Sequence, residues 1–147
     1  MCLNITQGRA SVARLACVFD TKEGSPGFLS EWLQRATQER DFTLPSSTGV
    51  VRDYIHVDDV VKALKAIVDN RKAAIYNVAS GENISNLELA SIFNDFGWQV
   101  ALRDKTELQR TPLCDISRLH SLGCLPRSSR DVVRDFLNAL GGQNASC

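Results

Sequence analysis

Two short apolar runs limit the folds that this chain can adopt. The first is SVARLACVF (11–19) and the second is AAIYNVA (73–79), which ends at Ser80-Gly81. Each run has the length of a strand and almost no charge, which is typical of parallel strands covered on both faces. Segments with helical periodicity lie between and after them, and this alternation predicts an α/β fold with parallel pairing.

Helices are predicted wherever an apolar face follows a capping residue. The expected helices are 28–40, 60–70 after Asp58 or Asp59, 85–96 with Ser85 as cap and Gly97 as stop, 116–122 after Asp115, and a last one opened by Ser128 or Ser129. Short strands are expected at 42–45, 54–57 and 98–103, with SSTGVV (46–51) as a polar turn. Two strongly apolar strands make a poor sheet, because parallel sheets need more neighbours. The chain is therefore part of something larger, or it closes its sheet against another copy.

Composition and charge narrow the class of protein. The 147 residues suffice for a single domain (1–147), and 17 basic residues balance 17 acidic ones. This balance predicts neither nucleic-acid nor membrane binding, and no apolar run approaches the roughly 20 residues that cross a bilayer. Five scattered cysteines without a CxxC pair, and no convincing signal peptide, favour reduced thiols and a cytoplasmic location.

Four stretches, in order, carry a resemblance to a known family. They are VARLACVFD, VVRDYIHVDDVVKAL, IYNVASGENISNLELASIF and CDISRLHSLGCLP. The order and content resemble the C-terminal, substrate-binding portion of extended short-chain dehydrogenases/reductases, the NAD-dependent nucleotide-sugar epimerases and dehydratases. The resemblance implies partial Rossmann-like parallel strands plus a small helical substrate-binding subdomain, without the N-terminal dinucleotide-binding half.

The resemblance also implies a set of substrate-binding residues. The arginine that matches Arg52 binds the diphosphate of a nucleotide sugar, for which a guanidinium supplies a planar fork of donors. A second basic residue often shares the diphosphate, and the candidates are Arg103, Lys105 and Arg110. The segment around Phe42, Thr43 and Leu44 is expected to pass the base with its backbone. The substrate-contacting asparagine of the family falls at Cys17.

Two features of the family are missing from these residues. There is no glycine-rich dinucleotide fingerprint, and the two tyrosines, Tyr54 and Tyr76, have Asp58 and Ser80 four places on rather than lysine. The sequence GSPGFLS (24–30) resembles the fingerprint only partly and is interpreted as a surface loop. No catalytic residue, cofactor-binding residue or metal ligand is predicted, and NAD is expected only if a separate chain supplies the cofactor half.

Other readings of the same residues stay open. Arg52 could form a structural ion pair with Asp53 or another acid, and Asp53 is expected to fix backbone or loop groups. HVDD (56–59) could suggest a metal site or part of a catalytic triad, but a helix N-terminus with favourably placed acids explains it more simply.

The leading hypothesis is a truncated or stand-alone epimerase/dehydratase-like protein that retains part of a nucleotide-sugar pocket and is not catalytic alone. The alternatives are an interaction or oligomerisation module, and a half-enzyme completed by a separate cofactor-binding chain. Because strands built for burial would lose their cover, a homodimer is predicted.

Overall fold

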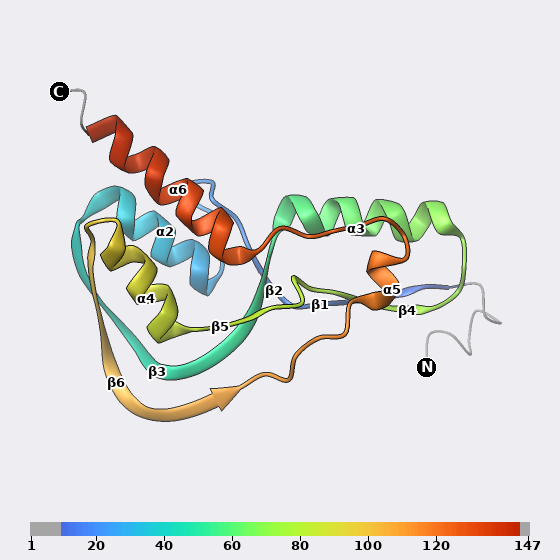
Figure 1. The fold of residues 1–147 in the computed structure, drawn as a ribbon, viewed down its shortest axis with the longest axis horizontal. Helices are drawn as coiled ribbons and strands as arrows, with labels where there is room; N and C mark the ends of the chain where they lie inside the picture. The colour runs from blue at the N-terminus through green and yellow to red at the C-terminus, as the bar shows by residue number, and fades with distance from the viewer. Residues whose placement is uncertain (1–9, 145–147) are drawn as a thin grey trace.

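The computed structural model describes residues 10–144, apart from the side chains of residues 104–107 and 143–144. In Figure 1 the helices α2, α4 and α6 gather at one end of an elongated body, and α3 and α5 accompany β1 and β4 at the other end. The elements in chain order are β1 Val12–Leu15, β2 Cys17–Phe19, α2 Phe28–Gln38, β3 Asp41–His56, α3 Val57–Asn70, β4 Ile75–Val78, β5 Asn83–Ser85, α4 Asn86–Asp95, β6 Gln99–Arg110, α5 Ser117–His120 and α6 Ser129–Asn144.

The two apolar runs pair in parallel, as predicted, but the first run is not one strand. β1 pairs with β4 so that Val12 lies opposite Ile75 and Leu15 lies opposite Val78. The N–H of Ala16 also donates to Val78 O. After Ala16 the chain changes partner, and β2 pairs in parallel with the end of β3. The apolar run thus serves two sheets, which is why a single continuous strand was the wrong expectation.

β3 runs without interruption where a polar turn was expected at 46–51. β6 pairs with it in parallel over most of its length, with irregularities on either side of Ser47, and β5 pairs with it in antiparallel fashion. Asn86 of α4 donates to Ser46 Oγ at 2.8 Å and to Ser47 O at 2.9 Å. These long-range partners hold an extended backbone through residues whose local preference is a turn.

Two apolar clusters organise the protein. The larger lies between α2, α4, α6 and the strands β3 and β6, and Trp32 stacks edge-on against Phe93 within it, with ring centroids 5.7 Å apart. The smaller lies under α3 and includes Ile55, Tyr76 and Leu119. The predicted inner faces of α2 and α6 are confirmed, because their apolar residues are buried.

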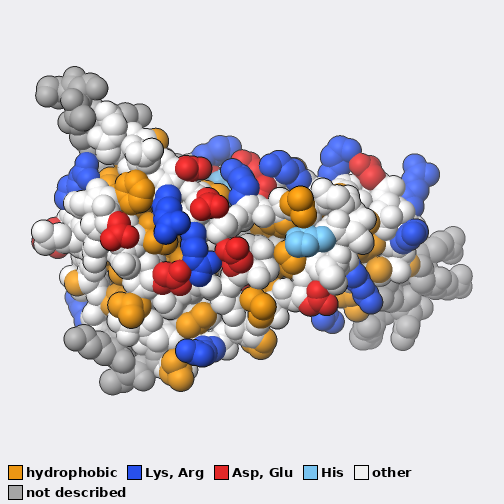
Figure 2. Space-filling view, in the orientation of Figure 1, with side chains coloured by type: hydrophobic (Ala, Val, Ile, Leu, Met, Phe, Trp, Pro, Cys, Tyr) orange, Lys and Arg blue, Asp and Glu red, His pale blue; other side chains and the backbone are white. Residues whose placement is uncertain are grey.

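Helix ends largely follow the predicted caps. Ser85 Oγ accepts the Glu88 N–H at 3.0 Å, and Gly97 has the positive φ that ends the following helix. In the described part of the chain, no helix combines the length and apolarity required for a membrane span. On the face drawn in Figure 2, acidic and basic side chains are interspersed rather than separated by sign.

Candidate functional site

Arg52 lies near the middle of β3, between β5 and β6. Its Nη2 donates to Gln109 Oε1 of β6 at 2.9 Å, and the side chain is half-buried. No ion pair joins Arg52 to an acid whose side chain the structure describes. The ion-pair alternative therefore has no support among these residues, of which Gln109 alone accepts a hydrogen bond from the guanidinium.

Asp53 has a different role from its neighbour. Its buried carboxylate accepts the Ser80 N–H and hydroxyl, both at 2.8 Å, and the Gly81 N–H at 2.9 Å. Burial raises the pKa of Asp53, although these hydrogen bonds favour the charged form. The carboxylate fastens the turn after β4 to β3, which confirms the structural role that the sequence predicted.

Tyr54 is a site residue that sequence reasoning missed. It lies opposite Cys17 in the β2–β3 pair and is almost completely buried. Burial raises its pKa, and the positive charge of Arg52 opposes that effect, so Arg52, Tyr54 and Cys17 are neighbours on this side of the sheet. The Tyr54 hydroxyl has no hydrogen-bond partner among the described residues. A buried hydroxyl without a partner costs roughly 1–3 kcal/mol, so this atom would gain from a polar group beside Arg52.

The segment expected to pass the base has mixed exposure. The Phe42 and Leu44 side chains are buried in the larger cluster. The hydrogen bond from the Gln99 N–H to Arg40 O sets a register in which the backbone groups of Phe42 and Leu44 face β6. Thr43 is exposed, and its carbonyl accepts Arg35 Nη1 at 3.4 Å. Among the strands of residues 10–144, only β6 pairs with β3 at these three positions. At the opposite edge of β3, Thr43 is the member of this trio that presents its backbone groups, and its carbonyl already accepts Arg35, so the predicted backbone contacts reduce to Thr43.

The structure separates the three candidates for a second basic residue. Arg110 lies opposite Val51, and because neighbouring strand residues point to opposite faces, it faces away from the side of Arg52 and Gln109. Arg103 is exposed and follows Leu102, whose strand partner is Leu44. The Lys105 side chain lies outside the described residues. Of the predicted set, Arg52 and Cys17 lie on the same side of the sheet, because Cys17 lies opposite Tyr54, two residues after Arg52.

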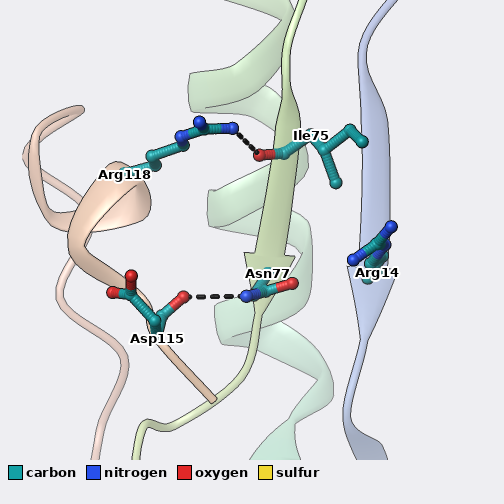
Figure 3. Close-up of a pocket in the computed structure, with 5 residues that line it drawn as sticks. All are labelled: Arg14, Ile75, Asn77, Asp115 and Arg118. Carbon is teal, nitrogen blue, oxygen red and sulfur yellow. Dashed lines mark hydrogen bonds between the residues drawn. The ribbon is translucent and has the colours of Figure 1, made fainter.

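A separate polar pocket of about 240 Å³ lies between β1, β4 and α5. Figure 3 shows Arg14 and Arg118 on either side of β4. Arg118 Nη1 donates to Ile75 O at 3.0 Å, and Asn77 Nδ2 donates to Asp115 O at 2.9 Å. These bonds hold the α5 segment against β4. Asp115 also accepts the Ser117 N–H at 2.9 Å, but the N-cap residue of α5 is Ile116, so the cap predicted at Asp115 lies one residue too early.

The start of α3 is a polar clamp rather than a metal site. His56, not Asp58 or Asp59 as expected, is the N-cap residue, and its Nδ1 accepts the Asp58 N–H at 3.2 Å. Asp59 is buried and accepts Arg127 Nε at 2.8 Å and Lys62 Nζ at 3.1 Å. No group of three or more potential ligands capable of holding a metal occurs in the part of the chain that the structure describes. The clamp joins the segment before α6 to α3.

Replacing Asp59 with asparagine is expected to change how stability depends on pH. Burial alone would raise the pKa of Asp59, but the hydrogen bonds from Arg127 and Lys62 outweigh it and hold this pKa below its ordinary 3.8. A lowered pKa stabilises the fold above pH 3.8, and this contribution is lost as the pH falls through the folded value. Asp59→Asn should cost about 1–2 kcal/mol at pH 7 and should lose less further stability in acid.

Urea unfolding at pH 7, 4 and 3 measures both effects of this substitution. Asp69→Asn is the control, because Asp69 pairs with Lys65 on the exposed surface of the same helix. That pair is worth only about 0.3–0.5 kcal/mol. An acid dependence of unfolding that is unchanged in Asp59→Asn would contradict the assignment.

The region that resembles a dinucleotide fingerprint is a loop, as interpreted. The chain turns between β2 and α2 through Asp20, whose carboxylate accepts the Lys22 N–H and the Ser25 hydroxyl. Gly27 has a φ of 120°, and a Cβ there would lie 3.2 Å from Val18 O. The glycine is thus needed for close approach to β2, within the protein itself.

Comparison with known proteins connects this geometry to one family. Residues 9–79 match the model of the NAD dependent epimerase/dehydratase family. No curated protein sequence matches the chain. The matched segment contains Cys17, Phe42, Thr43, Leu44 and Arg52, which are five of the eight predicted substrate-binding residues.

Solved structures extend the likeness of fold to nearly the whole chain. A dTDP-glucose 4,6-dehydratase from Bacillus anthracis in complex with NAD has a TM-score of 0.74 at 14% identity, over 97% of this chain and 47% of that one. A UDP-glucose 4-epimerase from Thermus thermophilus in complex with NAD has a TM-score of 0.70 at 22% identity, and the match covers 96% of this chain and 50% of that one. A UDP-glucose 4-epimerase from Thermotoga maritima with UDP-glucose has a TM-score of 0.70 at 17% identity, and the match covers 91% of this chain and 46% of that one. The chain thus has the Rossmann-like α/β fold of these proteins and spans about half their length.

Proposed function

We propose that this chain is the substrate-side, C-terminal half of an NAD-dependent epimerase/dehydratase-like protein and binds the diphosphate of a nucleotide sugar at Arg52. The observation that carries the proposal is the half-buried guanidinium of Arg52, which has no acidic partner among the described residues. It shares a face of β3 with Tyr54, whose hydroxyl has no hydrogen-bond partner among the same residues. A planar cation with spare donors suits a diphosphate, and a buried hydroxyl suits a polar ligand.

The comparisons support the ligand class. The Thermotoga maritima protein contains UDP-glucose, and a UDP-N-acetylglucosamine 4-epimerase from Methanobrevibacter ruminantium contains UDP-N-acetylmuramic acid. Both resemble this chain in fold, at 17% and 20% identity. In this proposal Cys17 lies along the sugar–phosphate portion of the ligand, and the backbone of Thr43 lies along its base. Arg103 or Lys105 rather than Arg110 supplies any second cation, because Arg110 faces the other way.

The residues of this chain do not fit a nicotinamide dinucleotide. Pro26 lacks the N–H that a phosphate loop would offer, and Gly27 packs against Val18 O. Tyr76 is buried, and its hydroxyl accepts Asn70 Nδ2 at 2.9 Å, so neither this residue nor buried Tyr54 is placed as an exposed base. We therefore propose that redox chemistry requires a cofactor half supplied elsewhere in a longer chain or by a separate chain.

A thermal-shift screen of UDP-, dTDP-, GDP- and CDP-sugars, with NAD and NADP, tests the proposed function. One nucleotide sugar at about 100 times its Kd should stabilise the protein by about 2.7 kcal/mol, which is several degrees in Tm. Arg52→Ala should abolish that shift, because the diphosphate loses its cation. NAD and NADP should give no shift.

Arg110→Ala is the matched control for this experiment. It removes the same charge from the neighbouring strand, one register position away, but from the opposite face. The Arg110→Ala protein should keep the nucleotide-sugar shift. A shift that survives Arg52→Ala, or the absence of a shift with every nucleotide sugar, would contradict the proposed diphosphate site.

A further inference from the structure

One flank of α3 carries an apolar stripe that no described residue covers. The inner face of the helix is buried through Val60, Ala63 and Ile67. Three further apolar residues remain exposed, with relative exposures of 62% at Val61, 40% at Leu64 and 72% at Val68. Their spacing of three and four residues places them in one row, roughly a quarter turn around the helix from the buried face. We call these three residues the α3 stripe.

The opposite flank of the same helix is covered. Asp59 binds the backbone N–H and Nε of Arg127 there, and a shallow pocket is shared by Lys62 and Ala66 with the turn after α5. Figure 1 shows the segment between α5 and α6 running alongside α3. An ordinary surface helix presents polar residues away from its core face. The α3 stripe is therefore exceptional within this fold.

The α3 stripe lies beside an apolar groove of about 430 Å³ between α3 and β1. The groove is lined by residues from both elements and from the turn that joins α3 to β4, namely Ser11, Ala13, Leu64, Ile67, Val68, Arg71, Lys72 and Ala73. Stripe and groove together form one continuous surface along the same side of the protein. A partner that covers the stripe would also close the groove.

β1 presents an open strand edge at this side. Val12 and Ala16 donate their N–H groups to β4, at Ala74 O and Val78 O. Because strand residues alternate in direction, the N–H and C=O groups of Ala13 and Leu15 point to the other edge, where no strand of residues 10–144 pairs. Leu15 is 51% exposed there. Open apolar edges of this kind pair with other strands.

We propose that a second copy of this chain covers this surface, with the two α3 helices packed antiparallel around a two-fold axis. The charges along α3 favour a second copy, because the helix begins with Asp58, which stays 59% exposed although Arg127 Nη2 lies 3.8 Å away, and ends at exposed Arg71 and Lys72. An antiparallel pair centred between Leu64 and Lys65 places Val61 against Val68 of the partner subunit. Asp58 then lies near Arg71 of the partner subunit and Lys72 of the partner subunit. The α3 stripe is thus self-complementary, as a two-fold interface requires.

Antiparallel packing also aligns the helix dipoles favourably, since the positive N-terminal end of each helix lies beside the negative C-terminal end of the other. Two symmetric charge pairs flank an apolar centre, which is the usual arrangement of a specific interface. The assembly does not use Arg52 or Tyr54, so it can exist whether or not a nucleotide sugar binds.

Sedimentation equilibrium of the whole chain tests this proposal from about 1 to 200 μM. The wild-type protein should reach twice its mass of 16.2 kDa, and Val61→Asp/Val68→Asp should stay a monomer with an unchanged circular dichroism spectrum. Leu87→Asp is the matched control, because Leu87 is an equally exposed apolar residue on α4, and that variant should dimerise as the wild type does. A wild-type monomer throughout this range, or a dimer indifferent to the Val61 and Val68 substitutions, would overturn the proposal.

A charge exchange distinguishes the antiparallel pairing from unspecific association. Asp58→Lys should weaken dimerisation roughly tenfold, because two symmetric pairs are lost and replaced by repulsion. Adding Arg71→Asp and Lys72→Asp should restore it, although each change alone is unfavourable for the dipole of its own helix. Failure of the combined variant to recover would refute this register. A monomeric wild type that gains mass only with a separate cofactor-binding chain would assign the surface to that chain instead.

Discussion

Replacing Asp53 with alanine is expected to lower the free energy of unfolding by at least about 3 kcal/mol, the larger of the two stability effects expected at the turn after β4. The substitution leaves the N–H groups of Ser80 and Gly81 without their acceptor, and the Ser80 hydroxyl keeps only Glu82 O, at 3.2 Å. Ser80 is buried, and each buried donor without a partner costs roughly 1–3 kcal/mol. The bonds join β3 to a turn 27 residues further along, so their loss also loosens the attachment of β4.

Urea unfolding followed by tryptophan fluorescence measures this loss. Asp53→Asn keeps the shape of the side chain and one acceptor oxygen but places an amide donor against the N–H groups. Its free energy of unfolding should therefore lie between those of the wild type and Asp53→Ala. Asp69→Ala removes an exposed carboxylate and should cost less than about 1 kcal/mol. If Asp53→Ala costs no more than Asp69→Ala, the turn is held by something other than this carboxylate.

The sequence predicts elements well where local chemistry decides them. The inner face of α2 and the Ser85 cap depend on periodicity or on neighbouring residues. The parallel pairing of the two apolar runs joins distant segments, but the continuous apolar composition of each run already indicates it. Each of these predictions is confirmed. The family resemblance identified Arg52, and the structure adds that its guanidinium has no acidic partner among the described residues.

The failures share a long-range cause. Ser46 and Ser47 belong to a strand because Asn86, some 40 residues later, and β6 bind their backbone and side chains. Nothing near them in the sequence signals that partner. The break at Ala16 likewise depends on two different sheets. The His56 cap was missed because two acids beside it are stronger capping candidates by residue type.

Within the candidate site, alternation along strands could have identified more. Tyr54 follows Arg52 by two residues, so the two share a face of β3, and this much is visible in the sequence. Its missing hydrogen-bond partner is not visible, because it depends on what packs around the hydroxyl. The exclusion of Arg110 needed the register of β6 on β3, which sequence patterns leave open.

Replacing Gly81 with alanine is expected to cost about 2–4 kcal/mol, from two separable causes. Its φ of 78° is in the left-handed region, which a residue with a Cβ enters at a cost of roughly 1–2 kcal/mol. The added Cβ would also lie 2.6 Å from Ile116 Cδ1 and 3.0 Å from Ile116 Cγ1, so the half-buried isoleucine must move. Overpacking of this kind costs roughly 1–3 kcal/mol.

Gly24 provides the matched control that separates the two causes of the Gly81 effect. Its φ of 76° is nearly the same, but nothing lies within 4 Å of its Cβ position, so Gly24→Ala reports the backbone cost alone. In an Ile116→Val background, which lacks Cδ1, Gly81→Ala should cost less than in the wild type. Unfolding free energies of the four proteins in this cycle give the coupling directly. Equal costs for Gly81→Ala and Gly24→Ala, without coupling to Ile116, would show that the turn after β4 can move away from the α5 segment.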